Sequence, residues 1–186
     1  MDREIFKMIS IRGRFAFGLF CLENLIECYQ IKSDLLDEII KNIGNYTDLE
    51  KLGAMEDYFY NIKPWCVESD FPKIKDNPDK LHEFGYDDFS LDDLKNLYEL
   101  YQLLPGDLKA ILNNLTSIAN SQISAGCGEY SPLTLEPTLK IIDIMEKHSH
   151  AQMPNIETFL FSGFSENHGW GNRFNYKKIT NRQHHV

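Results

Sequence analysis

Residues 15–29 read Phe-Ala-Phe-Gly-Leu-Phe-Cys-Leu-Glu-Asn-Leu-Ile-Glu-Cys-Tyr, and this stretch decides the fold. Its first two turns are apolar on every side, and a helix of that kind must be surrounded by other elements. From Leu22 onward the apolar positions narrow to one stripe, with Glu23 and Glu27 facing outward. We therefore expect a helix over residues 15–29 that forms the buried axis of a domain and emerges at its C-terminal end.

The same stretch does not fit a targeting or membrane segment. The acids Asp2 and Glu4 stand where a signal peptide needs basic residues, and the bulky Phe20 precedes Cys21. The apolar run is also shorter than the roughly 20 residues that span a bilayer. We expect a cytoplasmic protein that does not associate with membranes.

Composition predicts one folded domain, residues 1–186, with an acidic body. The chain is 42% hydrophobic and 25% charged, with a net charge of −9. Residues 21–165 hold eleven Lys or Arg against twenty-five acids, whereas both flanking segments are slightly basic. Such a body repels nucleic acid and attracts basic proteins, although charge of this kind also serves solubility alone.

The cysteines and histidines predict neither a disulfide framework nor a metal site. Cys21 and Cys28 lie about 10 Å apart along one helix, beyond disulfide reach. Cys66 and Cys127 lack the paired spacing of zinc ligands, and the histidines form no helical i, i+4 pair. We expect reduced thiols, no metal and no cofactor.

Helical spacing recurs along the rest of the chain, so the predicted fold class is all-α, an antiparallel bundle around the buried N-terminal helix. The predicted helices run from Ser33 to Gly44, from a Thr47/Glu50 capping box to Pro64, from Ser90 (capped with Asp93) to Leu104, from Leu108 to Ala119, and from Ser131 or Thr134 to a point before Pro154. The tight Pro105–Gly106 turn predicts an antiparallel helix hairpin. Pro137 is expected in the tolerated first turn of the last helix.

Two segments break this regularity. Residues 64–89 contain three prolines and many aromatic residues, which predicts an irregular but ordered excursion with a short helix near residues 79–84. After residue 154 periodicity is lost. The Gly- and Trp-rich C-terminal tail should fray over residues 175–186.

Residues 161–174, Phe-Ser-Gly-Phe-Ser-Glu-Asn-His-Gly-Trp-Gly-Asn-Arg-Phe, form the most unusual string. Glycines on both sides of a Trp allow tight turns while the indole docks in a pocket. The string is therefore either a clasp that pins the tail onto the bundle, or a binding tip that presents His168 and Trp170.

Catalysis and phosphate binding are weaker interpretations. Cys127 between two glycines, with His168 elsewhere, suggests a nucleophile and base, but such a pair needs contact and an orienting group that sequence does not show. The Gly126–Gly128 loop follows a helix and lacks the lysine of a phosphate loop, so a helix end and turn explain it better.

Two acidic clusters interleaved with aromatic residues predict a surface that docks a cationic protein. The alternative is a solvated acidic face, and the helix dipole alone explains the acids of a first helical turn. The candidate binding residues, with the two from the C-terminal string, are Glu68, Asp70, Phe71, Tyr86, Asp87, Asp88, Asp92, Asp93, His168 and Trp170.

Three strings together resemble one family. They are Phe-Gly-Leu-Phe-Cys-Leu-Glu at residues 17–23, Gly-Cys-Gly-Glu-Tyr-Ser-Pro at 126–132, and Ser-Glu-Asn-His-Gly-Trp-Gly-Asn-Arg-Phe at 165–174. The chain resembles the small acidic helical immunity proteins of bacterial polymorphic toxin and contact-dependent growth inhibition systems.

This resemblance implies a cytoplasmic, non-enzymatic inhibitor. It would bind the basic C-terminal toxin domain of its cognate effector as a monomer in a 1:1 complex and block its active site. The toxin would be a nuclease, with an RNase of the EndoU type as one candidate. Two other classes stay open: a helical adaptor in a regulatory complex, and an enzyme that uses Cys127 and His168.

Overall fold

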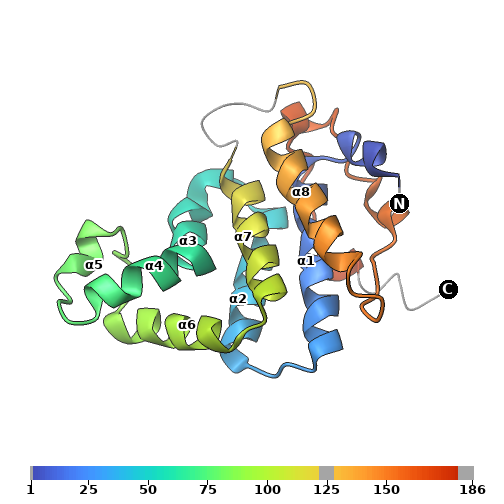
Figure 1. Cartoon of the computed structure of the whole chain (residues 1–186). Coiled ribbons are helices and arrows are strands. Elements are labelled where there is room, and N and C mark those ends of the chain that lie inside the picture. Colours follow the sequence, from blue (N-terminus) through green and yellow to red (C-terminus); the bar gives the residue numbers. More distant parts are fainter. Residues whose placement is uncertain (1, 122–127, 180–186) are drawn as a thin grey trace.

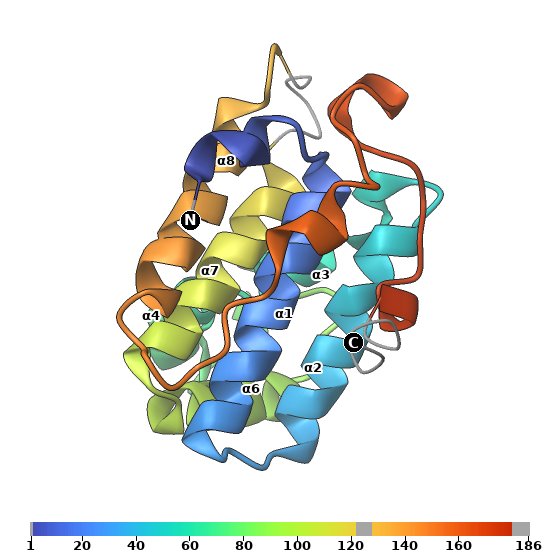
Figure 2. The ribbon, with the colours of Figure 1, turned by 90° about the vertical axis from the view of Figure 1, so that its right-hand side faces the viewer.

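The first long helix, α1 (Ile11–Tyr29), runs through the middle of the molecule (Figure 2). It belongs to a computed structural model that describes residues 2–121 and 128–179. Every residue from Ile11 to Leu22 is buried, which confirms the predicted axis. The helix begins four residues earlier than predicted because the Ser10 hydroxyl accepts a hydrogen bond from the backbone N–H of Gly13 at 3.1 Å and caps it.

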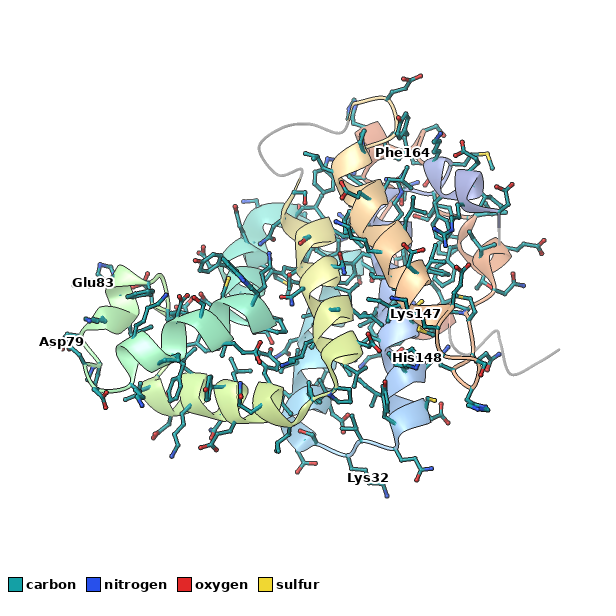
Figure 3. The ribbon with its side chains drawn as sticks, in the orientation of Figure 1. Lys32, Asp79, Glu83, Lys147, His148 and Phe164 are labelled. Atoms are coloured by element: carbon teal, nitrogen blue, oxygen red, sulfur yellow. The ribbon has the colours of Figure 1, made fainter. Side chains whose placement is uncertain are left out.

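The other elements form an antiparallel bundle around α1 and an arm that projects from it (Figure 1). The bundle consists of α1, α2 (Asp34–Gly44), α7 (Gly106–Asn120) and α8 (Pro132–Met145); α3 (Glu56–Asn61) leads into the arm of α4 (Pro64–Ile74), α5 (Lys80–Glu83) and α6 (Leu91–Leu103). Short 3₁₀ turns are η1 (Arg3–Lys7), η2 (Asn45–Asp48), η3 (Leu52–Met55), η4 (Ile156–Phe159) and η5 (Asn167–Gly169). Asp79 and Glu83 lie at the tip of the arm (Figure 3). The all-α prediction is confirmed.

A glycine lets α7 and α8 approach α1 closely. A Cβ atom at Gly18 would lie 2.9 Å from side-chain atoms of both Leu115 and Ile141. Those residues belong to α7 and α8, so the three helices meet at this point. Aromatic edges fill the space around it, with the ring centroids of Phe17 and Phe159 5.5 Å apart.

Two fully buried arginines anchor the N-terminal end of α1. Arg12 donates from Nη1 to the carbonyl oxygens of Tyr46 and Thr47 at 3.0 and 3.1 Å, and from Nη2 to that of Leu49 at 2.8 Å. The guanidinium therefore fixes the chain that follows α2.

Arg14 fixes chain segments on the opposite side of the bundle in the same way. It donates to the carbonyl oxygens of Phe6, Ser131 and Tyr130 and to the Thr134 hydroxyl, all within 3.1 Å. These contacts hold η1 and the start of α8 against α1. Nothing in the hydrophobic pattern of the sequence predicts that charged side chains occupy this core.

The helix boundaries set by Ser33 and Ser90 are confirmed. Each hydroxyl accepts from the backbone N–H three residues later, and Ser90 with Asp93 forms a complete capping box. The predicted Thr47/Glu50 capping box is wrong, because the Thr47 hydroxyl in η2 donates to the carbonyl oxygen of Gly44 at the end of α2.

The predicted irregular excursion is wrong for residues 64–74, which form α4 (Pro64–Ile74). Pro64 occupies the first helical turn, where its missing N–H costs nothing, so it begins a helix instead of only ending one. The predicted short helix near residues 79–84 is confirmed as α5.

The predicted hairpin of α6 and α7 is also wrong. After Pro105 the chain turns sharply, and α6 lies at a wide angle to α7 (Figure 1). α6 packs instead against α4, and α7 packs against α8 and α1. In α8, Pro132 occupies the first turn and Pro137 lies in the second turn, while Thr134 is inside the helix and does not cap it.

The C-terminal segment returns to α1 and α2, as the clasp interpretation expects. Trp170 accepts from the backbone N–H of Arg12, and a Cβ atom at Gly171 would lie 2.2 Å from the Ser10 hydroxyl. Tyr176 and Ile179 are buried, so the predicted fraying is wrong for residues 175–179. Residues 180–186 lie outside the described residues.

Candidate functional site: an acidic and aromatic pocket

Three of the ten predicted binding residues make contacts within the arm or between the arm and the bundle. Glu68 forms a 2.6 Å ion pair with Lys109 of α7 and stabilises the junction of arm and bundle. Asp70 is buried and receives hydrogen bonds from Lys73 and from the hydroxyl of Tyr86, which is also buried. These three side chains therefore stabilise the arm and are not available to a partner.

The remaining predicted residues divide by position. Phe71 packs its ring against Tyr98 with centroids 4.7 Å apart. Asp87 is exposed and contacts His82. Asp92 is exposed in the first turn of α6.

His168 and Trp170 do not belong to the same surface as the acids. Trp170 contacts Arg12 at the N-terminal end of α1, whereas α6 crosses near the other end of the bundle (Figure 2). Phe164, from the same string, lies where α8 begins (Figure 3), with its ring centroid 5.1 Å from the Arg14 guanidinium carbon. The predicted set therefore does not form one interface.

Asp88 and Asp93 do come together, in a pocket of about 300 Å³ between α2, α3 and α6. A third carboxylate, Glu38, reaches it from α2, and among the residues that the structure describes no lysine or arginine lines it. The remaining lining residues are Leu35, Ile39, Asn42, Tyr58, Ile62, Phe89, Asn96 and Leu97. An acidic rim thus surrounds an apolar and aromatic floor.

Local structure fixes the acids of the pocket. The Asp93 carboxylate accepts from the N–H and the hydroxyl of Ser90 at 2.9 and 2.6 Å, and these bonds lower the pKa of Asp93. Asp88 lies in a turn closed by the bond from the Phe89 N–H to the Tyr86 carbonyl at 3.1 Å. The buried Tyr86 anchors that turn, so Asp88 projects from a fixed base.

The aromatic wall is positioned from the bundle side. Asn42 of α2 donates from Nδ2 to the Tyr58 hydroxyl at 3.4 Å, and the Tyr58 and Phe89 ring centroids are 6.5 Å apart. Burial raises the pKa of Tyr58, with the nearby Glu38 carboxylate adding to the effect. The phenol is therefore neutral at physiological pH and presents its ring face and edge to the pocket.

The carboxylates of the pocket have no cationic partner in the described part of the chain. Glu38, Asp88 and Asp93 take part in no ion pair there, in contrast to Glu68 and Asp70. Three unpaired negative charges over apolar side chains favour a ligand that is cationic and partly apolar.

The sequence does not predict three of the pocket residues, which are Glu38, Asn42 and Tyr58. Glu38 lies on the polar face of an amphipathic helix, where an acid is expected for solvation alone. Only the packing of α6 against α2 turns this part of the helix into a pocket wall.

The catalytic alternative requires Cys127 beside His168, and the structure shows no such pair among the residues that it describes. Cys127 lies outside the described residues, and His168 is exposed with a left-handed φ of 56°. Within residues 2–121 and 128–179, no three His, Cys, Asp or Glu side chains are grouped to hold a metal ion. Among these same residues, no helix has both the length and the apolar character needed to cross a bilayer.

The structure is that of a small, acidic, all-α protein with a pocket whose rim carries carboxylates. No protein-family model, curated protein or solved structure matches this chain.

Proposed function

We propose that this protein is an immunity protein, an inhibitor that binds and neutralises the basic toxin domain of a polymorphic toxin or contact-dependent growth inhibition effector. The observation that carries the proposal is the pocket with three carboxylates and, within residues 2–121 and 128–179, no lining lysine or arginine. The net charge of −9 and the three family-like strings agree with it. The toxin class that fits best is a nuclease, because nucleases expose cationic clefts that hold phosphates.

The proposed mechanism is occlusion of the toxin's substrate cleft. Carboxylates at the rim of the pocket take the place of substrate phosphates, while Tyr58 and Phe89 supply the apolar contact that gives a complex its lifetime. Opposite charges also accelerate encounter. Rapid capture matters for an inhibitor that must act before the toxin cleaves its target.

The first experiment is a pull-down from the native host, with the protein tagged at its N-terminus and bound proteins identified by mass spectrometry. Recovery of a basic toxin fragment, encoded directly upstream, supports the proposal. Recovery of a host regulatory complex favours the adaptor alternative and contradicts the proposal.

A second experiment tests the pocket with the recovered toxin domain. We expect the association rate to fall about tenfold or more between low and high salt, since exposed charges are screened within about 10 Å at 0.1 M. The double variant Glu38→Gln/Asp88→Asn should lose most of this salt dependence. Asp92→Asn removes a nearby exposed acid outside the pocket and is the matched control. Equal rates for all three proteins would exclude the pocket from the interface.

A further inference from the structure

The shape and chemistry of the pocket restrict the group it can receive. Its volume of about 300 Å³ is at the lower end of ligand sites, which suits one side chain better than a cofactor. The floor of Ile39, Ile62 and Leu97 is apolar, whereas the rim carries the carboxylates. A ligand must therefore have an apolar stem and a cationic head.

We propose that the pocket receives a single arginine side chain of the partner protein. The proposal rests on the proposed function only in that the partner is a protein. The guanidinium would lie between the carboxylates of Glu38 from α2 and Asp88 and Asp93 from the α6 side, and the methylene stem would contact the apolar floor.

Two features favour arginine over lysine. The first is the aromatic wall: the planar guanidinium stacks on aromatic faces, and Tyr58 and Phe89 present their rings to the pocket. The second is the number of acceptors. Besides the carboxylates, the pocket offers the Asn42 Oδ1 atom as an acceptor, because Asn42 Nδ2 donates to the Tyr58 hydroxyl. The five N–H groups of a guanidinium would therefore find acceptors on both sides of the pocket.

The site is organised before any ligand arrives. The capping box holds Asp93, the buried Tyr86 anchors the turn with Asp88, and Asn42 orients Tyr58. Since these groups do not need to be ordered on binding, more of the contact energy is expressed as affinity.

The test uses three capped amino acids as probes of the isolated, ¹⁵N-labelled protein: N-acetylarginine amide, the matching lysine amide, and the citrulline amide, which has the shape of arginine without its charge. The arginine probe should shift the backbone signals of Asn42, Tyr58 and residues 88–97, with a dissociation constant on the order of millimolar for so small a ligand. The lysine probe should bind about threefold or more weakly. The citrulline probe should leave these signals unchanged.

Variants locate the site. Glu38→Gln and Asp88→Asn should each weaken arginine binding about tenfold, whereas Asp92→Asn should leave it unchanged. Tyr58→Leu, which keeps an apolar side chain but removes the ring, should abolish the preference for arginine over lysine. Retention of the native signal dispersion shows that each variant is folded.

The outcomes separate the two proposals. Equal binding of arginine and lysine, binding of citrulline, or shifts away from the pocket would each overturn the arginine site while leaving immunity to be judged by the pull-down. Arginine binding in the pocket together with recovery of no toxin would keep the site and reject the proposed immunity function.

Discussion

At the scale of single residues, the main surprise is a charged core. Arg12 is buried and its guanidinium is held by backbone carbonyl groups, without an ion pair among the described residues. Burial lowers the pKa of Arg12, and a planar group with donors in several directions offsets that cost by satisfying three carbonyl oxygens.

Replacing Arg12 by lysine should therefore be strongly destabilising. Lysine keeps the charge but has one compact ammonium group, so it leaves carbonyl oxygens of Tyr46, Thr47 or Leu49 without a donor. We expect Arg12→Lys to lower the free energy of unfolding by about 2–3 kcal/mol, measured by urea denaturation. Arg3→Lys, at a more exposed ion-paired position, should leave the free energy of unfolding nearly unchanged. Equal effects at both positions would contradict the role assigned to Arg12.

Glu23 gives the protein a pH dependence of known sign. Burial raises the pKa of this α1 carboxyl from 4.5 to about 7, against the opposing effect of Lys177. Because the folded state holds the proton more tightly than the unfolded chain, this group makes the free energy of unfolding fall as pH rises from about 4.5 to about 7.

The variant Glu23→Gln removes that dependence. Relative to the unmodified protein it should gain about 1 kcal/mol of stability at pH 8, after allowance for screening by solvent, and lose the gain below pH 4.5. Chemical denaturation at the two pH values measures the difference. Glu27→Gln, an exposed position one turn further along α1, is the control. A stability difference that does not vary with pH would refute the assignment.

At the scale of elements, the end of α2 is shaped by the C-terminal segment. Gly44 has ordinary helical backbone angles, so glycine is required here for lack of space and not for its conformation. A Cβ atom at this position would lie 2.1 Å from the Tyr176 ring. The helix ends at Gly44, as the sequence predicts, but Gly44 does not adopt the left-handed conformation that is typical of a terminating glycine.

A double-mutant cycle tests this contact. Gly44→Ala alone should lower the free energy of unfolding by about 1–3 kcal/mol through steric strain. In a Tyr176→Ala background the same change should become neutral or stabilising by about 0.5–1 kcal/mol, because alanine is the better helix former. Thermal or urea unfolding of the four proteins provides the numbers, and additive effects would contradict the contact.

The elements that the sequence predicts well are those whose signals are local. Ser33 and Ser90 each act on an N–H three residues away, and the all-round apolarity of α1 depends on no neighbour. The sequence does not predict α4, because Pro64 and Pro72 are residues that normally interrupt a helix, although Pro64 fits a first helical turn. The sequence also does not predict the wide angle between α6 and α7, because the residues of a turn do not determine how the two helices cross.

The candidate site was predicted only in part for a similar reason. Asp88 and Asp93 stand in an acidic run that the sequence displays openly, but Asp70 and Tyr86 in the same region turn inward toward each other. Glu38 joins the pocket only through the packing of distant helices. Charge and aromatic content predict the kind of surface, whereas tertiary structure decides which acids remain unpaired.

At the scale of the whole molecule, arm and bundle share one hydrophobic core. Its buried residues extend without interruption from α1 to Leu94 and Leu97 of α6. The Tyr101 hydroxyl donates to the Ile62 carbonyl at 2.5 Å, and Glu68 pairs with Lys109 across the junction. The pocket lies at this junction, so its shape depends on the arm staying in place.

We therefore expect arm and bundle to unfold together. Differential scanning calorimetry should show one transition whose calorimetric and van't Hoff enthalpies agree. Near-ultraviolet circular dichroism, which reports the packing of aromatic side chains in both arm and bundle, should follow the same single curve as the helical signal. Two resolved transitions would mean that the arm is a separate unit.

The central position of α1 also has a consequence for how the protein folds. Its partners Ile141, Phe159 and Tyr176 lie far later in the sequence than α1 itself. Because contacts between distant parts of a chain form slowly, we expect the cover of α1 to be completed late in folding, with the most apolar helix partly exposed to aggregation until then.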